Sequence, residues 1–329
     1  MGRAMKVCIV GAGAIGGLIG TRLALAGHDV SALARGATLD ALRKHGWRLR
    51  KNGQLHSVPA RASDHTAELG SQDLVVVAVK GHSLPDVAPQ IEPLLAPHTL
   101  VLPAMNGVPW WFGCGVPALE RAPLASVDPG GVVSKAIPFE QVIGCAVYTS
   151  ASILEPGLVE HNTGDKLIIG EPAGGESDRA QCLGHALKWA GFEVTCSADV
   201  RRDIWSKLWL NLTLNPVSAL TGATTHQLLA DPLVRVLCSR AMHEASAVGA
   251  KIGCAIDPQP EERLALMREL GSMKPSMLQD VEAGRALELD AIVGAVREIA
   301  QRVGVATPNI DALLGITRLF ARTRGLYPA

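Results

Sequence analysis

Hydrophobic residues in the first part of the chain form short β-rich runs, separated by segments with helical periodicity. The runs predicted as strands cover residues 7–10, 29–34, 74–79, 99–103 and 142–148. Helices are predicted at 13–26 and 84–95. Such alternation predicts an α/β fold with a doubly wound parallel sheet of the Rossmann type. Two later runs, 157–170 and 192–197, are predicted to add strands at the end of this sheet.

From about residue 201 the pattern changes to long helical segments. They cover residues 204–214, 233–251, 261–270 and 276–303. A length of 329 residues with 48% hydrophobic residues is enough for two domains, each with its own core. We therefore predict a Rossmann-type domain at residues 1–198 and a mostly α-helical domain at 199–329.

A glycine-rich turn follows the first predicted strand. It reads Gly11-Ala12-Gly13-Ala14-Ile15-Gly16, the G-x-G-x-x-G pattern, and leads into the first predicted helix. The first glycine permits a tight turn, the second lets the backbone approach a pyrophosphate, and the third lets the helix pack on the strand. The helix N-terminus offers free amides to the phosphate charge. Its place between strand and helix predicts a dinucleotide site; the alternative is a glycine-rich turn without nucleotide.

The residue that ends the second predicted strand indicates which nicotinamide cofactor is bound. A carboxylate there would accept hydrogen bonds from the ribose and repel a 2′-phosphate, but the strand ends Ala34-Arg35. The Arg35 guanidinium has the charge and fork geometry to bind that phosphate, which favours NADPH over NADH. The alternative is a solvated surface arginine.

Two further polar residues stand where predicted strands end. Lys80 closes the run 74–79, and Asn106-Gly107 follows the run 99–103. Ligands of doubly wound sheets bind outside the carboxyl ends of the strands, so both side chains are expected near the nicotinamide. The alternatives are a surface lysine and a turn asparagine.

In the second half, Lys207, Asn211 and Asn215 recur every four residues within an apolar segment. On a helix this spacing places them on one face. Buried lysine and asparagine need polar partners, which a substrate carboxylate, carbonyl or hydroxyl would supply. The alternative is the solvent-facing stripe of an amphipathic helix.

Charge and composition exclude several classes of function. The formal net charge is +0 and the pI about 7.1, so no nucleic-acid partner is expected. The seven cysteines are scattered and lack a C-x-x-C pair, and the ten histidines show no ligand spacing, so we expect reduced thiols and no metal. No apolar stretch is long enough to span a membrane, and the glycine-interrupted N-terminus does not resemble a signal peptide. A cytoplasmic protein is expected.

Together these motifs resemble the ketopantoate reductase (2-dehydropantoate 2-reductase) family, over almost the whole chain. The resemblance is carried by Gly11 to Gly16, Lys80, Asn106-Gly107, the Lys207/Asn211/Asn215-Pro216 helix, Pro275-Ser276-Met277-Leu278-Gln279-Asp280 and Leu287-Glu288-Leu289-Asp290. It implies NADPH-dependent reduction of 2-dehydropantoate to pantoate.

The resemblance also implies roles for individual residues. Lys207 would act as general acid on the C2 carbonyl oxygen, and Glu288 would hydrogen-bond a substrate hydroxyl. The residues implied to hold the substrate's other polar groups are Asn211, Asn215 and Ser276, while Lys80 and Asn106 would lie between nicotinamide and substrate. From spacing alone, Ser276 also fits the N-cap of a capping box with Gln279, and Glu288 also fits an exposed helix carboxylate.

The resemblance loosens after Asn106-Gly107. A Gly/Pro-rich excursion runs from Trp110 to Gly131, where compact members of the family are shorter. Trp110, Trp111 and Phe112 either line an enlarged apolar substrate pocket or pack the loop down. This departure leaves the exact 2-oxoacid open.

Three other functions are kept as alternatives. One is the NADPH-dependent reduction of another 2-oxoacid. A second is a β-hydroxyacid dehydrogenase, which also uses a lysine but fits the Lys207, Ser276 and Glu288 pattern less well. A third is an NADPH-binding sensor without turnover. A homodimer through the helical domain is possible, and the oligomeric state is not readable from the sequence.

Overall fold

The computed structural model describes residues 4–120, 122–256, 259–269 and 271–327, which fall into two compact units. The first unit comprises the described residues of 1–105 and 132–203, and the second those of 106–131 and 204–329. Residues 106–131 thus pack with the helices, although they precede strands of the first unit. The predicted domains 1–198 and 199–329 do not separate this segment, because its Gly/Pro-rich pattern indicates a loop but not the unit with which the loop packs.

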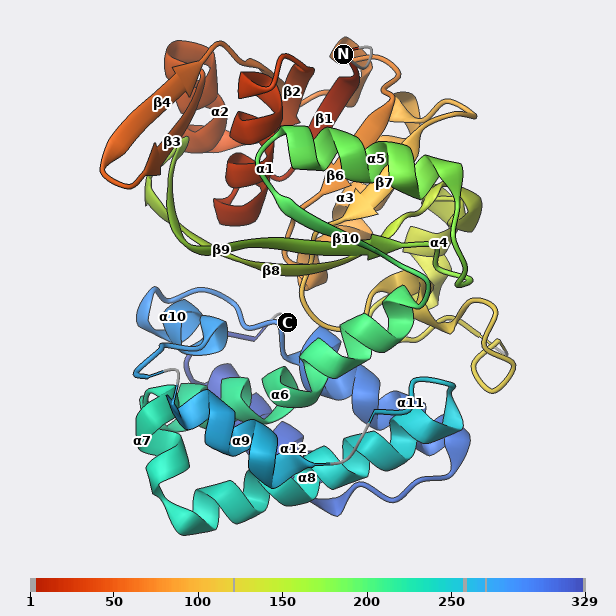
Figure 1. Cartoon of the computed structure of the whole chain (residues 1–329), viewed down its shortest axis with the longest axis vertical. Helices are drawn as coiled ribbons and strands as arrows, with labels where there is room; N and C mark the ends of the chain where they lie inside the picture. Colours follow the sequence, from red (N-terminus) through yellow and green to blue (C-terminus); the bar gives the residue numbers. More distant parts are fainter. Residues whose placement is uncertain (1–3, 121, 257–258, 270, 328–329) are drawn as a thin grey trace. The chain divides into compact units, whose positions relative to one another are not determined.

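The first unit contains a parallel sheet with the strand order β5-β2-β1-β6-β7 (Figure 1). Its strands are β1 (Lys6–Val10), β2 (Asp29–Leu33), β5 (Arg61–Ser63), β6 (Leu74–Val77) and β7 (Leu100–Pro103). The predicted Rossmann-type fold class is confirmed. The order of the strands reverses between β1 and β6, which places a ligand crevice at the carboxyl end of β1.

Helices of the first unit connect these strands. They are α1 (Ala14–Leu25), α2 (Gly36–His45), α3 (Leu84–Val87), α4 (Val132–Ala136) and α5 (Asp178–Trp189), with 3₁₀ turns at η1 (Thr66–Glu68), η2 (Gly81–Ser83), η3 (Ala88–Leu94) and η6 (Phe139–Gln141). The segment predicted as one helix at 84–95 is a single α-turn followed by a 3₁₀ helix. Pro89 and Pro93 lack the amide donors that a continuous α-helix needs.

A second sheet lies on the other side of α1. Its strands are β3 (Trp47–Lys51), β4 (Gln54–Val58), β8 (Gly144–Glu155), β9 (Leu158–Gly170) and β10 (Glu193–Ser197), in the order β10-β9-β3-β4 with β8 antiparallel to β9. A Cβ on Gly16 would lie 3.0 Å from Ile9 of β1, and one on Gly17 would lie 2.6 Å from Val159 of β9. Because α1 is covered on both faces, the two sheets are separate layers.

The prediction that residues 157–170 and 192–197 extend the first sheet is therefore wrong. These segments are β9 and β10 of the second sheet, and the run predicted at 142–148 belongs there too, as β8. Only an isolated bridge between Val101 and Val142 links this run to β7. Apolar residues of both sheets, together with α1 and α5, form one core.

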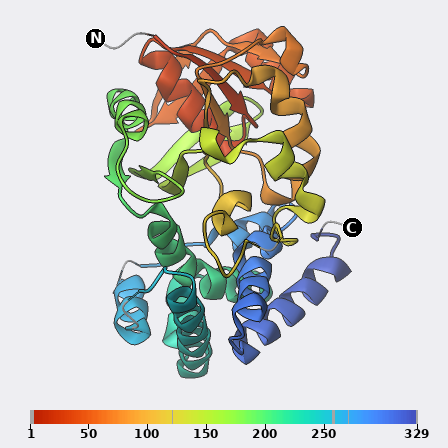
Figure 2. The same ribbon diagram turned by 90° about the vertical axis from the view of Figure 1, so that its right-hand side faces the viewer.

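The second unit is mostly helical, as predicted (Figure 2). Its elements are α6 (Val200–Thr221), α7 (Thr225–Ala230), α8 (Pro232–Lys251), α9 (Pro260–Glu269), α10 (Ser276–Glu282), the π-helical turn η7 (Asp290–Gly294), α11 (Ala295–Val303) and α12 (Pro308–Thr323), with 3₁₀ turns at η4 (Trp110–Gly113) and η5 (Pro129–Gly131). The indole nitrogens of Trp205 and Trp209 donate to the carbonyls of Ala245 and Met242, at 3.1 and 2.6 Å, which fixes α6 against α8.

Two helices predicted in this unit do not match the described elements over their full length. The continuous helix expected at 276–303 is broken, because α10 ends before Gly284, whose φ of +63° lies in the left-handed region. Leu270, the last residue of the helix predicted at 261–270, lies outside the described residues. No helix of the described chain combines the length and the apolar character needed to cross a bilayer.

The aromatic residues after Asn106 pack inward. Trp110, Trp111 and Phe112 are buried, and the Phe112 ring stacks on Trp205 of α6 with centroids 5.8 Å apart and planes 26° apart. Of the two interpretations that the sequence left open, the structure favours the one in which these residues pack the loop down.

Candidate functional site

The glycine turn has the geometry expected of a phosphate-binding loop. The Gly11 amide donates to the Leu33 carbonyl at 3.1 Å, and the φ of +93° at Gly11 strongly favours glycine. A Cβ on Gly16 would lie only 2.0 Å from the Gly11 carbonyl oxygen. Gly13 is the N-cap of α1 without a side-chain cap, and a Cβ there would find nothing within 4 Å. The first helical amides therefore face open space, which fits a bound pyrophosphate.

A cavity of about 240 Å³ lies beside this turn. It is lined by Val10, Gly11, Ala12, Gly13, Leu33, Ala34, Arg35, Thr38, Asp64, Val79, Val87 and Gln90. Arg35 is exposed, as a group that binds a phosphate at the rim must be. Ala14 and Ile15 form the first turn of α1 behind Gly13.

Asp64 is a lining residue that the sequence analysis missed. It follows β5, which pairs with β2, so its carboxylate comes from the strand next to the one that ends before Arg35. Arg43 lies 3.9 Å from this carboxylate, and both side chains are about half exposed. The cavity thus offers a cation and a partly neutralised anion. In Rossmann folds a carboxylate at the end of the second strand binds the ribose hydroxyls. Asp64 could serve the same purpose here, although it follows β5, the strand that pairs with β2.

Lys80 is the third residue after β6 and precedes the 3₁₀ turn η2. Its carbonyl accepts from the Ser83 amide at 2.9 Å, and the residue is half-buried. Lys80 therefore lies at the carboxyl edge of the parallel sheet, as predicted, although the strand ends at Val77 and not at Val79.

The polar face predicted around Lys207 lies on α6. Lys207 and Asn211 are half-buried and Asn215 is 3% exposed, so these residues are not a solvent-facing stripe. The Lys207 Nζ donates to the Asn106 Oδ1 at 2.8 Å. Two residues that are 101 positions apart in sequence, and were predicted separately as site residues, are thus in direct contact.

The residues after Asn106 reach the turn that carries Glu288. The Val108 amide donates to the Ala291 carbonyl at 2.8 Å. Gly107 has a φ of +83°, and a Cβ there would lie 2.5 Å from the same carbonyl oxygen, so only glycine fits. The Glu288 carbonyl accepts from the Ile292 amide at 3.2 Å, at the start of the π-helical turn η7. Such turns often occur at functional sites.

Glu288 itself is 9% exposed, so its alternative interpretation as an exposed helix carboxylate is wrong. The C-terminal segment holds the turn around it from the other side. The Leu287 amide donates to the Leu326 carbonyl at 2.8 Å, and the Tyr327 hydroxyl donates to Asp290 at 2.6 Å. Burial and the Asp290 carboxylate raise the pKa of Tyr327 to about 12, which keeps this donor protonated.

Ser276 is exposed and is the first residue of α10, whose N-cap position is occupied by Pro275. The Ser276 hydroxyl makes no hydrogen bond to any other described residue, and Gln279 donates to the Lys274 carbonyl at 2.9 Å. The capping-box interpretation of Ser276 and Gln279 is therefore wrong, because the helix begins at Ser276 itself, one residue earlier than that motif requires. The substrate role of Ser276 stays a prediction.

All seven cysteines are free thiols, and Cys8, Cys145, Cys238 and Cys254 are buried. Burial raises the pKa of the Cys8 thiol to about 11, so it stays protonated inside β1. Within the described ranges, no three His, Cys, Asp or Glu side chains are grouped as a metal site would require.

Comparison with known proteins gives matches along the whole length of both units. A sequence profile described as "Ketopantoate reductase PanE/ApbA" matches residues 7–174, and one described as "Ketopantoate reductase PanE/ApbA C terminal" matches residues 199–321. A 2-dehydropantoate 2-reductase of Mesorhizobium japonicum is 44% identical over 326 residues, covering 98% of this chain and all of that protein.

Solved structures agree with these sequence matches. A Ralstonia solanacearum MolK2 protein assigned to the ketopantoate reductases is 51% identical, with a TM-score of 0.95 over 99% of this chain and all of that one. D-mandelate dehydrogenase, solved with NADH and anilino(oxo)acetate, superposes with a TM-score of 0.83 over 98% of this chain and all of that one. At 21% identity it shares the fold alone.

Proposed function

Because this chain belongs to the ketopantoate reductase family, we propose that it reduces the C2 carbonyl of 2-dehydropantoate to the hydroxyl of pantoate, with NADPH as cofactor and Lys207 as general acid. NADPH, when bound, supplies the hydride. As hydride adds to C2, the carbonyl π electrons pass to oxygen, and a proton from the Lys207 ammonium converts the alkoxide into a hydroxyl. Solvent then returns a proton to Lys207.

The observation that carries this proposal is the contact between Lys207 and Asn106. An amide oxygen is a neutral acceptor, so this hydrogen bond orients the ammonium without cancelling its charge. A fixed cation directed at developing negative charge stabilises the transition state and shortens the path of the proton.

Further residues are assigned to substrate binding. Glu288 is proposed as a second catalytic residue that hydrogen-bonds a substrate hydroxyl, and its burial supports a role other than a surface charge. Asn211 and Asn215 follow Lys207 on the same face of α6 and are proposed to hold the substrate's carboxylate and hydroxyl groups. Ser276 is proposed to contribute a further hydrogen bond.

The reaction is tested by following NADPH oxidation with 2-dehydropantoate and with a series of larger 2-oxoacids. The highest kcat/KM is expected for 2-dehydropantoate. If a larger 2-oxoacid is preferred by tenfold or more, the chain is a reductase of that acid instead. If NADPH binds but no 2-oxoacid is reduced, the proposal fails and the protein is better described as an NADPH-binding sensor.

The proposed preference for NADPH over NADH rests on Arg35, whose positive charge would attract the 2′-phosphate. Asp64 lines the same cavity, and its negative charge would repel that phosphate. We expect Arg35→Gln to raise the KM for NADPH about 10- to 100-fold, because a charge-assisted hydrogen bond is worth about 1.5–3 kcal/mol. Asp64→Asn removes a negative charge from the same cavity and is expected to lower the KM for NADPH severalfold.

The KM for NADH is the internal control for both variants, because NADH lacks the 2′-phosphate. It is expected to change less than threefold in Arg35→Gln. An equal loss of both cofactors would mean that Arg35 supports the fold of the rim and does not read the phosphate. NADH is a realistic competitor, since D-mandelate dehydrogenase holds it on the same fold.

A further inference from the structure

We propose that residues 106–131, here called the strap, hold Lys207 in position, and that Glu298 and Arg302 of α11 are positioning residues that act through the strap. The proposal rests on the general-acid role of Lys207. It adds to the proposed function a pair of residues far from Lys207 in sequence and outside every motif recognised above.

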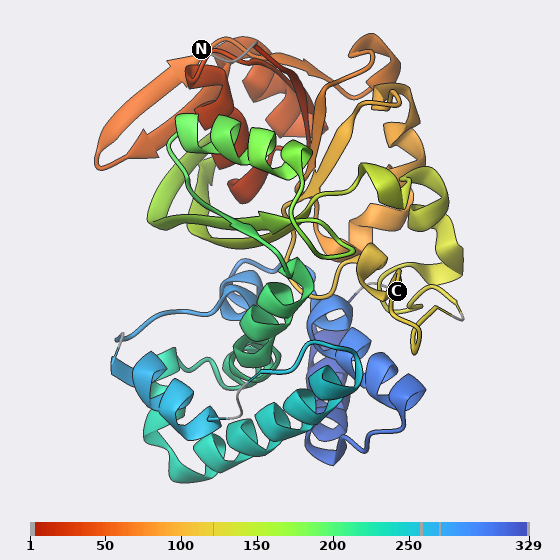
Figure 3. The same cartoon turned by 45° about the vertical axis from the view of Figure 1, so that its right-hand side comes forward.

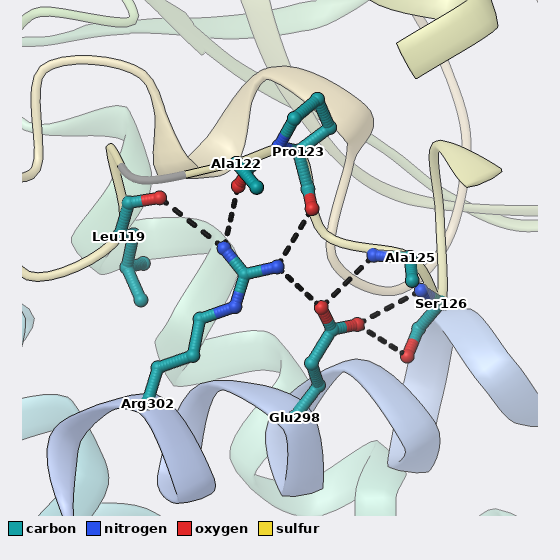
Figure 4. Close-up of polar contacts among 7 residues, drawn as sticks. All are labelled: Leu119, Ala122, Pro123, Ala125, Ser126, Glu298 and Arg302. Atoms are coloured by element: carbon teal, nitrogen blue, oxygen red, sulfur yellow. Dashed lines mark hydrogen bonds and ion pairs between the residues drawn. The ribbon is translucent and has the colours of Figure 1, made fainter. Parts of the chain in front are cut away.

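Several contacts join the described residues of the strap to other elements of its unit, and Figure 3 shows the strap's ribbon beside the helices of that unit. Near its start, the Val108 amide bonds to Ala291 of η7. Four residues further on, Phe112 stacks on Trp205 of α6. Towards its end, two side chains of α11 bind Leu119, Ala122, Pro123, Ala125 and Ser126 (Figure 4).

Arg302 replaces backbone partners that this part of the strap lacks. Its Nη1 donates to the carbonyls of Leu119 and Ala122, at 3.2 and 2.5 Å, and its Nη2 donates to Pro123 at 2.6 Å. The same Nη2 lies 2.5 Å from the Glu298 carboxylate. A planar fork with several fixed donors can bind three carbonyls and a carboxylate together, which a lysine cannot do.

Glu298 binds the next part of the strap. Its carboxylate accepts from the amides of Ala125 and Ser126, at 2.9 and 2.8 Å, and from the Ser126 hydroxyl at 2.7 Å. Burial alone would raise the pKa of Glu298, but these donors and Arg302 lower it below its ordinary value. The carboxylate is therefore ionised throughout the neutral range. Glu298 and Arg302, here called the clamp, thus keep their charges across that range.

Both attachments of the strap are made to one helical segment, which consists of η7 and α11. The turn η7 runs directly into α11, so Ala291, Glu298 and Arg302 belong to one continuous stretch, and that stretch binds the strap near both ends. The strap reaches α6 twice, through Asn106 on Lys207 just before the Ala291 attachment and through Phe112 on Trp205 just after it. The strap thus bridges α6, which carries Lys207, and the turn that follows Glu288.

Asn106 lies in a stretch without helix or strand hydrogen bonds, so its position depends on these attachments. Releasing the clamp is expected to weaken the hydrogen bond from Lys207 to Asn106. Loss of an acceptor favours the neutral amine, so Lys207 would lose its proton at lower pH. A small displacement of a catalytic group is enough to cost one to two orders of magnitude in rate.

The test compares Arg302→Gln and Glu298→Gln with Arg297→Gln, a matched control on the same helix. Arg297 makes an exposed ion pair with Asp311 at 3.1 Å and no contact with the strap among the described residues. In the two clamp variants we expect kcat to fall about tenfold, its alkaline decline to move to lower pH, and the Kd for NADPH to stay unchanged. Arg302→Lys is expected to restore only part of the loss.

Two further measurements separate positioning from general stability and from the reaction itself. Hydrogen exchange at Ala125 and Ser126 reports whether the clamp has opened, and Ser126→Ala, which removes one bond, is the milder variant if the others fold poorly. Limited acetylation of Lys207 across pH, read by peptide mass spectrometry, gives the midpoint of its deprotonation without any substrate.

The proposal is overturned if the strap amides exchange faster in Arg302→Gln while the acetylation midpoint of Lys207 stays that of the wild type and of Arg297→Gln. A wild type that reduces no 2-oxoacid would overturn the proposed function alone, because the acetylation midpoint still decides whether the strap positions Lys207. A shifted midpoint in both clamp variants, with an unchanged midpoint in the control, supports the proposal.

Discussion

Lys207→Ala is expected to lower kcat for 2-dehydropantoate by about a thousandfold while changing the Kd for NADPH less than twofold. Removing a positioned general acid costs about 10²–10⁴ in rate, and Lys207 also supplies the charge that stabilises the alkoxide. Lys207 is not among the residues that line the cavity beside the glycine turn, so we expect its removal to change cofactor binding little. Steady-state kinetics at saturating substrate and fluorescence titration with NADPH measure the two quantities.

Two comparison variants sharpen this test. Lys251→Ala removes an exposed lysine from α8 and is expected to leave kcat unchanged. Lys207→Arg keeps the positive charge but holds its proton too tightly to donate it, so its kcat shows how much of the effect is electrostatic. If Lys207→Ala retained more than a tenth of the wild-type kcat, the general acid would have to be another group, and Lys80 would be the next to test.

The parallel sheet was predictable because its strands are buried on both faces. Continuous apolar runs such as residues 74–77 are typical of strands in such sheets, and the glycine turn indicates where β1 ends and α1 begins. The second sheet was not assigned correctly because β9 has apolar ends and a polar middle, so its pattern does not reveal its partners. The β3–β4 hairpin carried a signal that was overlooked, Asn52-Gly53, whose positive φ angles are those of a tight hairpin turn.

The candidate site also has local features that the sequence predicts and non-local features that it does not. The face shared by Lys207, Asn211 and Asn215 follows from helical spacing, which a sequence displays directly. The contact between Lys207 and Asn106 depends on an excursion of the chain from one unit into the other, which no local pattern encodes. Glu298 and Arg302 are spaced like an ordinary surface ion pair, and only the structure reveals the carbonyls and amides that they bind.

Gly13→Ala and Gly16→Ala are expected to fail for different reasons, although both break the same motif. A Cβ at Gly13 meets nothing within 4 Å, and the φ of −77° at this residue suits any amino acid, so the melting temperature should not change. The added methyl would occupy space that a pyrophosphate needs, and we expect the Kd for NADPH to rise tenfold or more.

At Gly16 the added Cβ would lie 2.0 Å from the Gly11 carbonyl oxygen, a backbone atom that cannot move without shifting the turn. Overpacking of this kind costs about 1–3 kcal/mol or more, which corresponds to a fall in melting temperature of about 5–10 °C. Gly315→Ala is the matched control, because its Cβ also meets nothing within 4 Å but lies on α12. Unfolding scans and NADPH titrations of the three variants separate space kept for a ligand from space required by the fold. If Gly13→Ala bound NADPH as tightly as Gly315→Ala does, the space above this turn would not be the pyrophosphate site, and the cofactor would have to bind elsewhere on the sheet edge.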